Sequence, residues 1–128
     1  MSGRLDKYLY AIRTLKEKYL CVRCVDVAHF LKLSKPSVST SVRQMQEKGL
    51  IQVEPDGNLA LTLAGQEQAD ILSERICFFE NLLIEAGVDP STARQDSLSF
   101  GWKMSRDSFE AFQRMREKEP DGPVSQDS

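Results

Sequence analysis

The chain has 128 residues, of which 28% are charged and 41% hydrophobic, and its formal net charge is −2. This length can bury one core, or one small domain with an added helical subdomain. Since no long stretch is continuously apolar and the first residues lack the features of a signal peptide, we expect a cytoplasmic protein without a membrane span. One histidine, with no Gly-rich phosphate loop, nucleophile elbow or paired-carboxylate motif, leaves no catalytic constellation, so we do not expect an enzyme.

The first 50 residues contain three helical patterns. Apolar residues spaced three and four apart predict a first helix, namely Leu5, Leu9, Ile12, Leu15 and Tyr19. A second, shorter helix is predicted from Val27, Ala28, Phe30 and Leu31. Ser34 can cap a third helix, and Pro36 suits its first turn because proline has no N–H to leave unpaired there. The third helix therefore begins near residue 35.

The third helix has the residue pattern of a DNA recognition helix. Val38, Val42 and Met45 form its apolar face. The residues predicted to face outward are Ser37, Ser39, Thr40, Ser41, Arg43 and Gln44. Small hydroxyls let a helix lie deep in the major groove, and Arg and Gln suit guanine and adenine edges. Groove contacts are predicted for Ser37, Ser39, Thr40, Arg43 and Gln44, and phosphate contacts for Lys35, Lys48, Arg23 and Arg4. The alternative is a polar helix without a partner.

A short hairpin follows the third helix. Gly49 suits a left-handed helix end, and residues 50–53 and 59–62 read as two strands around a tight turn at residues 54–58. This predicts the wing of a winged helix-turn-helix. Its tip holds Glu54 and Asp56 but no Lys or Arg, which argues against strong contact with the phosphate backbone.

The charge divides between the two parts of the chain. Residues 1–50 hold ten Lys and Arg against four Asp and Glu, a net charge of +6, whereas residues 51–128 hold seven against fifteen, a net charge of −8. A basic first part fits a DNA-binding module of residues 1–64, followed by an acidic helical part.

Helical patterns also dominate the second part. Thr62 can cap a long linking helix that ends near Gly87, and further helices begin near Pro90 and Ser105. Their apolar stripes exceed what one chain can hide, so we expect a homodimer formed by residues 65–118, which binds a pseudo-palindromic site in double-stranded DNA. Residues 119–128 read as a disordered tail. The expected fold is mainly α with a small β-wing.

Several short sequences occur in a specific order: Asp6-Lys7-Tyr8-Leu9-Tyr10-Ala11-Ile12, Asp26-Val27-Ala28, Pro36-Ser37-Val38-Ser39, Leu59-Ala60-Leu61-Thr62-Leu63-Ala64-Gly65 and Leu83-Ile84-Glu85-Ala86-Gly87-Val88-Asp89. Over residues 5–117 the chain resembles the manganese transport regulator branch of the diphtheria toxin repressor family. The resemblance implies a homodimeric repressor that binds operators when manganese or iron(II) is sufficient. Its metal sites would lie between the DNA-binding and dimerisation domains.

The chain departs from this family where the metal would bind. The resemblance puts the family's ligand positions on Lys7, Tyr10, Ile76, Leu98, Gly101 and Trp102. None of these supplies a carboxylate or imidazole, and a Lys ammonium repels a cation. We therefore predict no metal cofactor, although a one-residue shift of the alignment would bring in Cys77. The apolar replacements are predicted to pack the first helix onto the dimerisation helices and make DNA binding metal-independent. The alternative is a pocket for another, apolar effector beside Trp102.

Cys21 and Cys24 have the spacing of a metal or redox motif, and His29 follows five residues later. A closed zinc site needs four donors, and Cys77 alone is left to complete one. We interpret the pair as structural or incidental, with thiol sensing or adventitious metal binding as the alternatives. A winged-helix module that binds protein partners is the remaining alternative function. The acidic wing and the lost metal site favour it, whereas the basic first part argues against it.

Overall fold

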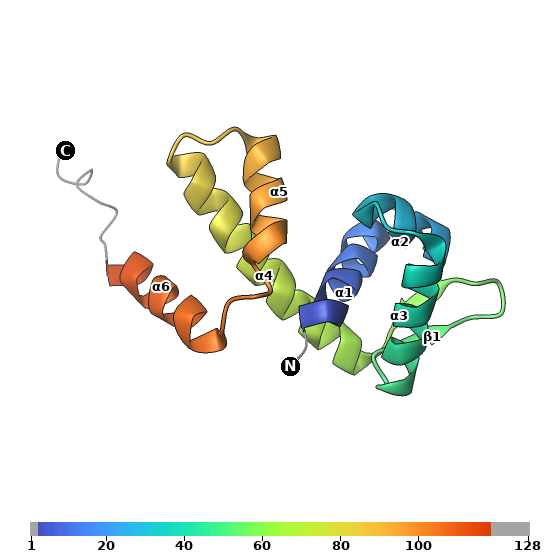
Figure 1. Ribbon diagram of the computed structural model, residues 1–128. Helices are drawn as coiled ribbons and strands as arrows, with labels where there is room; N and C mark the ends of the chain where they lie inside the picture. The colour runs from blue at the N-terminus through green and yellow to red at the C-terminus, as the bar shows by residue number, and fades with distance from the viewer. Residues whose placement is uncertain (1–2, 119–128) are drawn as a thin grey trace.

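The computed structural model describes residues 3–118 of the chain, which form six α-helices and one two-stranded sheet (Figure 1). In chain order they are α1 (Gly3–Lys16), α2 (Cys24–Leu31), α3 (Lys35–Glu47), β1 (Ile51–Val53), β2 (Leu59–Leu61), α4 (Leu63–Glu85), α5 (Pro90–Phe100) and α6 (Arg106–Lys118). The predicted mainly α fold with a small β-wing is confirmed. The predicted disordered tail lies outside the described residues. No helix within residues 3–118 is long and apolar enough to cross a membrane.

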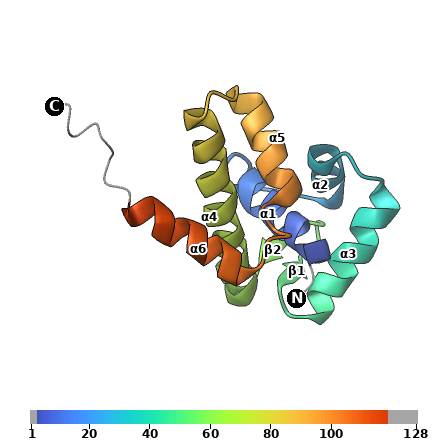
Figure 2. The same ribbon diagram turned by 60° about the vertical axis from the view of Figure 1, so that its left-hand side comes forward.

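The core of the winged-helix part lies between α1, α2, α3 and the small sheet. Its fully buried side chains come from every one of these elements and from the loop before α2, and they include Leu9, Ile12, Val22, Val27, Val38, Met45 and Leu59. Each large apolar side chain that is fully buried stabilises the fold by roughly 1.5–3 kcal/mol. This core holds α3 at the outer edge of the molecule, on the side away from α6 (Figure 2).

Local capping positions the helices as the sequence predicts. Ser34 Oγ accepts a hydrogen bond of 3.3 Å from Ser37 N at the start of α3. Gly49 takes a φ of +74° just after that helix. Thr62 Oγ1 accepts from Gly65 N at the start of α4 and donates to Gly49 O at 2.7 Å. The cap of α4 is thereby tied to the end of α3.

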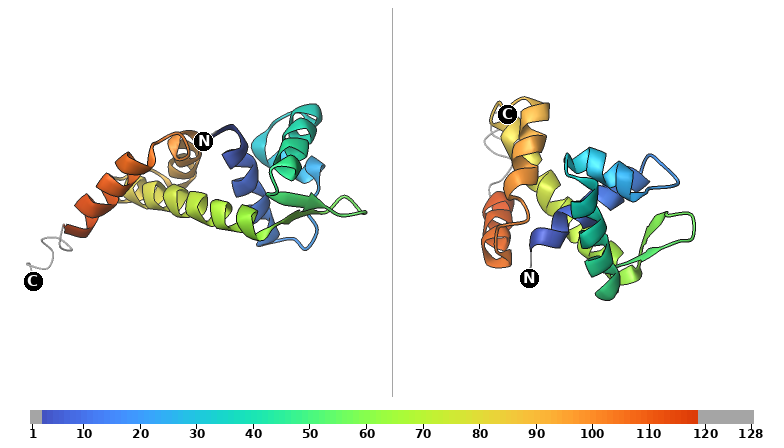
Figure 3. Two further views of the ribbon diagram at one scale, coloured as in Figure 1. Left: turned by 90° about the horizontal axis from the view of Figure 1, so that it is seen from below. Right: turned by 45° about the vertical axis from the view of Figure 1, so that its right-hand side comes forward.

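The helix α4, with 23 residues, connects the two parts of the molecule. It runs from the base of the wing to the C-terminal helices, and the hairpin projects from the end opposite α6 (Figure 3). Arg13 on α1 holds α4 through a 2.7 Å contact with Asp70 and a 3.1 Å hydrogen bond to Ser73. At the other end, Phe79 contacts the rings of Phe78, Phe100, Phe109 and Phe112 at centroid distances of 5.1–5.9 Å.

Two predicted orientations are wrong. The helix α1 ends at Lys16, so Tyr19 lies in the following turn with 56% of its surface exposed rather than on the apolar face of α1. Ser41 was expected to face outward, but it is 1% exposed. It lies three residues after Val38 and four before Met45, which places it on the buried face of α3.

At Gly65, α4 packs closely against the backbone at the start of the wing. A Cβ at Gly65 would overlap the backbone carbonyl of Leu50, which cannot move aside as a flexible side chain can. We expect Gly65→Ala to lower the free energy of unfolding by about 1–3 kcal/mol, measured from the midpoint of urea denaturation. The control is Ala64→Ser at the neighbouring exposed position, where a change within about 0.5 kcal/mol is expected. Equal midpoints for both variants would contradict the steric argument.

Candidate nucleic-acid interface

The exposed face of α3 presents most of the predicted groove contacts to solvent. Ser37, Ser39, Thr40 and Arg43 are exposed, and Gln44 is half-buried. Lys35 and Lys48 stand exposed at the two ends of the helix. Within α3 the only acidic residue is Glu47, in its last turn, so the N-terminal part of this face carries no charge that would repel DNA.

Arg4 on α1 reaches the same helix. Its guanidinium donates to the side-chain oxygen of Gln44 and lies 3.5 Å from Ser41 Oγ. Arg4 was predicted to contact phosphate. Its contact with Gln44 could not be predicted from a local sequence pattern, because the two residues lie 40 positions apart in the chain. A bidentate contact of Gln44 with adenine would use both its oxygen and its nitrogen, and the oxygen has a second lone pair with which it could also keep the contact with Arg4.

The wing is fixed to the rest of the domain by Asn58. Asn58 Oδ1 accepts hydrogen bonds from Val22 N at 2.9 Å and from Lys16 Nζ at 2.7 Å. Its amide nitrogen donates to Glu54 at 2.8 Å, so this carboxylate is engaged within the wing. The strands pair antiparallel with Gln52 opposite Ala60. The hairpin is therefore held firmly at the edge of the domain.

A basic side chain also reaches the wing from outside the hairpin. Arg23, at the N-cap of α2, donates from Nε to the carbonyl oxygen of Asp56 at 2.8 Å, and its side chain packs beside Gly57. The hairpin sequence has no Lys or Arg of its own, yet the folded wing tip carries this guanidinium. The hairpin sequence could not predict this guanidinium, because Arg23 lies 33 residues away from Asp56 in the chain.

The cysteines do not form an evident metal centre. Cys21 and Cys24 are free thiols and half-buried, and Cys77 is exposed on α4. Burial raises the pKa of the Cys24 thiol, which lowers the fraction of reactive thiolate near neutral pH. Within residues 3–118 no three His, Cys, Asp or Glu side chains are arranged to hold a metal ion. Thiol sensing stays a hypothesis.

The six positions compared with metal ligands meet at the junction between the two parts of the chain. The rings of Tyr10 and Trp102 lie 6.3 Å apart, and Tyr10 also faces Phe30 at 6.5 Å. Gly101 packs so closely on Ile76 that an added Cβ would lie 2.8 Å from its Cδ1. Lys7, Leu98 and Trp102 line one cleft. Aromatic and aliphatic packing thus joins α1 to the end of α5.

Comparison with known proteins agrees with this architecture. The family model described as Iron dependent repressor, N-terminal DNA binding domain, matches residues 1–59. The transcriptional regulator MntR of Escherichia coli O157:H7 is 31% identical over 114 residues, which cover 89% of this chain and 74% of that protein. MntR of Salmonella typhimurium is 32% identical over 108 residues, which cover 84% and 69%. The chain belongs to the diphtheria toxin repressor and manganese transport regulator family. It is a DNA-binding transcriptional repressor of that family and not an enzyme.

Solved structures show the same fold. A manganese-dependent transcriptional repressor in complex with manganese aligns with a TM-score of 0.78 at 23% identity, over 89% of this chain and 51% of that one. The hypothetical protein SSo2273 from Sulfolobus solfataricus aligns with a TM-score of 0.64 at 24% identity, over 92% and 91% of the two chains. At these identities the likeness establishes the architecture alone.

The junction residues do not fit the metal ions that this family uses. Manganese and iron(II) prefer carboxylate, imidazole and water ligands. The corresponding side chains here are an ammonium, a phenol, an indole, two aliphatic chains and a hydrogen atom. Moving the comparison by one residue would bring in Cys77, which is exposed on α4.

Proposed function

We propose that two copies of this chain form a dimer through the C-terminal helices and bind a pseudo-palindromic operator through α3 without a metal ion. The observation that carries this proposal is the contact between Tyr10 and Trp102. It joins α1 to the C-terminal part at the position where metal coordination would do so in relatives.

The DNA-binding part of the proposal rests on α3. Its exposed Ser and Thr hydroxyls are small enough for close approach to bases, and Arg43 is exposed with a guanidinium suited to guanine. Lys35 and Lys48 are exposed at the two ends of the helix, where they would contact phosphates on either side of the groove. Two-fold repetition of this helix in a dimer would match a site with two half-sites.

Exposed apolar side chains on the C-terminal helices support a dimer. Ile84 on α4 is 39% exposed, and Phe112 and Met115 on α6 are 38% and 60% exposed. In α6, Phe109 is the buried residue that anchors the helix on the Phe78 and Phe79 rings. A second copy could cover the remaining apolar face. Pairing here leaves α3 of each copy free for DNA.

Metal independence is supported by the chemistry of the junction. Aromatic pairs contribute about 0.5–1.5 kcal/mol each beyond the area that they bury, and they do so at any metal concentration. Lys7 lines the adjoining cleft, where its ammonium disfavours a divalent cation. A protein-binding module is the less favoured function, because an apolar interface would not explain the hydroxyl-rich face of α3.

The first test is fluorescence anisotropy of a labelled duplex from the gene's own upstream region. We expect Kd values that agree within about twofold in excess chelator and in manganese or iron(II), because the junction is closed by packing. Binding that requires metal would contradict the proposal. If that duplex does not bind, a random-sequence selection supplies the operator. Failure of the selection as well, or affinity that ignores salt, would favour a protein partner.

Base reading by α3 can be tested with Arg43→Ala. At a selected operator we expect a loss of about 1–3 kcal/mol, with little change on random-sequence DNA. Lys48→Ala is the comparison variant, for which we expect similar losses on both sequences because a phosphate contact carries no sequence information. An equal loss on both duplexes for Arg43→Ala would assign Arg43 to the backbone.

The role of the junction can be tested with Trp102→Ala. We expect dimers of this variant to bind the operator about tenfold more weakly, since losing this aromatic contact weakens the packing of α1 on the C-terminal part. Trp102→Phe keeps a ring beside Tyr10 and should retain most of the affinity. The dimer is checked by light scattering at each concentration used. Parental affinity in Trp102→Ala dimers would show that the junction does not control DNA binding.

A further inference from the structure

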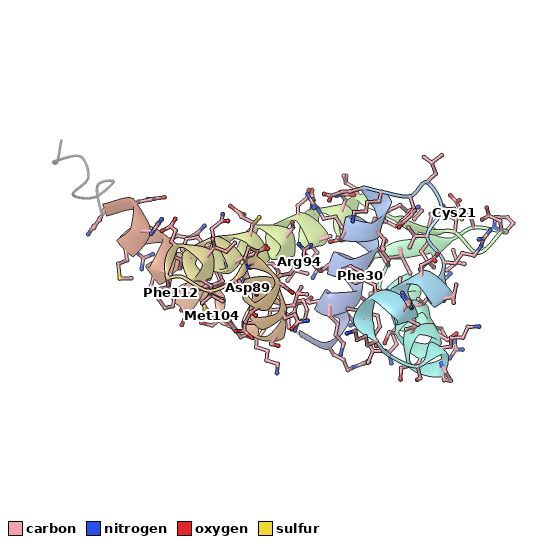
Figure 4. All side chains as sticks on the ribbon, turned by 90° about the horizontal axis from the view of Figure 1, so that it is seen from above. Cys21, Phe30, Asp89, Arg94, Met104 and Phe112 are labelled. Carbon is pink, nitrogen blue, oxygen red and sulfur yellow. The ribbon has the colours of Figure 1, made fainter. Side chains whose placement is uncertain are left out.

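A cleft of about 580 Å³ separates the end of α2 from α5 at this junction. Phe30 lines it from α2 and Arg94 lines it from α5 (Figure 4). Its floor is apolar, formed by Phe30, Leu98 and Trp102 together with Leu31 and Leu33. Its polar edge is formed by serines, one glutamine and basic side chains. The volume lies within the range of sites for small molecules, about 300–1,000 Å³.

The charge of this cleft has a single sign. Lys7, Lys32, Arg94 and Lys103 line it, and no Asp or Glu is among its lining residues. The three lysines make no ion pair with any residue of the described chain. Arg94 is partly engaged, since it lies 3.8 Å from Glu80 and 3.4 Å from the Tyr10 hydroxyl. Like charges gathered around an apolar floor repel one another, and a bound anion would relieve that repulsion.

The chain conformation contributes to this arrangement. Lys32 ends α2 with a φ of +58°, a left-handed conformation that is uncommon for residues other than glycine. Glycine would take it at less cost, but it would remove the ammonium from the cleft. Lys7 comes from α1 and Lys103 from the turn after α5, so three separate segments supply the three lysines.

We propose that this cleft binds a small organic anion with a flat apolar body and a carboxylate, sulfonate or phosphate group. The body stacks on Phe30 and Trp102, and the anionic group meets Lys7, Lys32 and Lys103. The place where relatives carry a cation has thus changed to one that prefers an anion. The occupant bridges α2 and α5 and thereby alters operator affinity. This effect on operator affinity rests on the proposed function, whereas the anion site itself does not.

The site can be tested without DNA, using the full-length protein and 1-anilinonaphthalene-8-sulfonate as the probe. Trp102 is the only tryptophan of the chain, so energy transfer from tryptophan to the probe reports binding to this part of the molecule, and the lysine variant assigns it to the cleft. We expect saturable transfer with the parent protein. We expect a Kd about tenfold higher for the double variant Lys7→Gln/Lys103→Gln, because two partly exposed charge partners are lost.

Two controls separate this site from general binding. The double variant Arg114→Gln/Lys118→Gln removes the same charge from exposed positions of α6 and should bind like the parent. N-phenyl-1-naphthylamine, which has the same rings without the sulfonate, should bind at least tenfold more weakly to the parent. Equal binding of the neutral probe, or unchanged affinity in the cleft variant, overturns the anion site.

Coupling to DNA is measured separately. Saturating probe should change the operator Kd of the parent at least threefold and leave that of the cleft variant unchanged. An unchanged parent Kd would overturn the role of the ligand as an effector. If the parent takes up no probe while the cleft variant loses affinity for random DNA, the lysines serve phosphates and the anion site is overturned. Probe binding is measured without DNA, so the anion site can be present even if the protein fails to bind the operator.

Discussion

The packing of α1 between the two parts of the molecule is the constraint on which the rest of the structure depends. On one side α1 contributes Leu9 and Ile12 to the winged-helix core, and on the other Arg13 holds α4. Between them, Tyr10 meets Trp102 beyond the end of α5. Arg4, at the beginning of the same helix, contacts Gln44 on α3. α1 therefore contacts both α3 and the C-terminal part, in addition to the link between α3 and the start of α4 through Thr62 and Gly49.

The proposed replacement of metal coordination by packing would change the conditions under which such a junction forms. A metal ion stabilises it only when the ion concentration exceeds its dissociation constant, so the stability depends on supply. Apolar contacts are part of the folded chain and have no such dependence. A repressor built in this way would remain assembled unless another molecule acts on the junction. The basic cleft beside Trp102 supplies a surface at which that could occur.

Local signals predicted the helices well, whereas contacts between distant segments could not be predicted. Ser34 and Thr62 cap helices as expected, and Gly49 and Gly87 adopt positive φ, because these features depend on a few neighbouring residues. The placement of Arg23 on the wing and the hydrogen bonds of Asn58 depend on how three segments meet. The sequence raised a pocket beside Trp102 as an alternative, but the positive charge of the cleft could not be predicted. Its four basic residues are spread from position 7 to position 103, so no window of sequence contains them.

The fold brings residues together that are distant in sequence, and this also affects how the net charge of the first 50 residues should be interpreted. Their ten basic side chains give a net charge of +6, but the fold does not direct all of them toward DNA. Arg13 is paired with Asp70, Lys16 is bonded to Asn58, and Lys7 and Lys32 line the cleft. The salt dependence of DNA binding reports the number of phosphates neutralised, so a count of basic residues overstates it. Part of the positive charge belongs to the junction, where it is available to a ligand other than DNA.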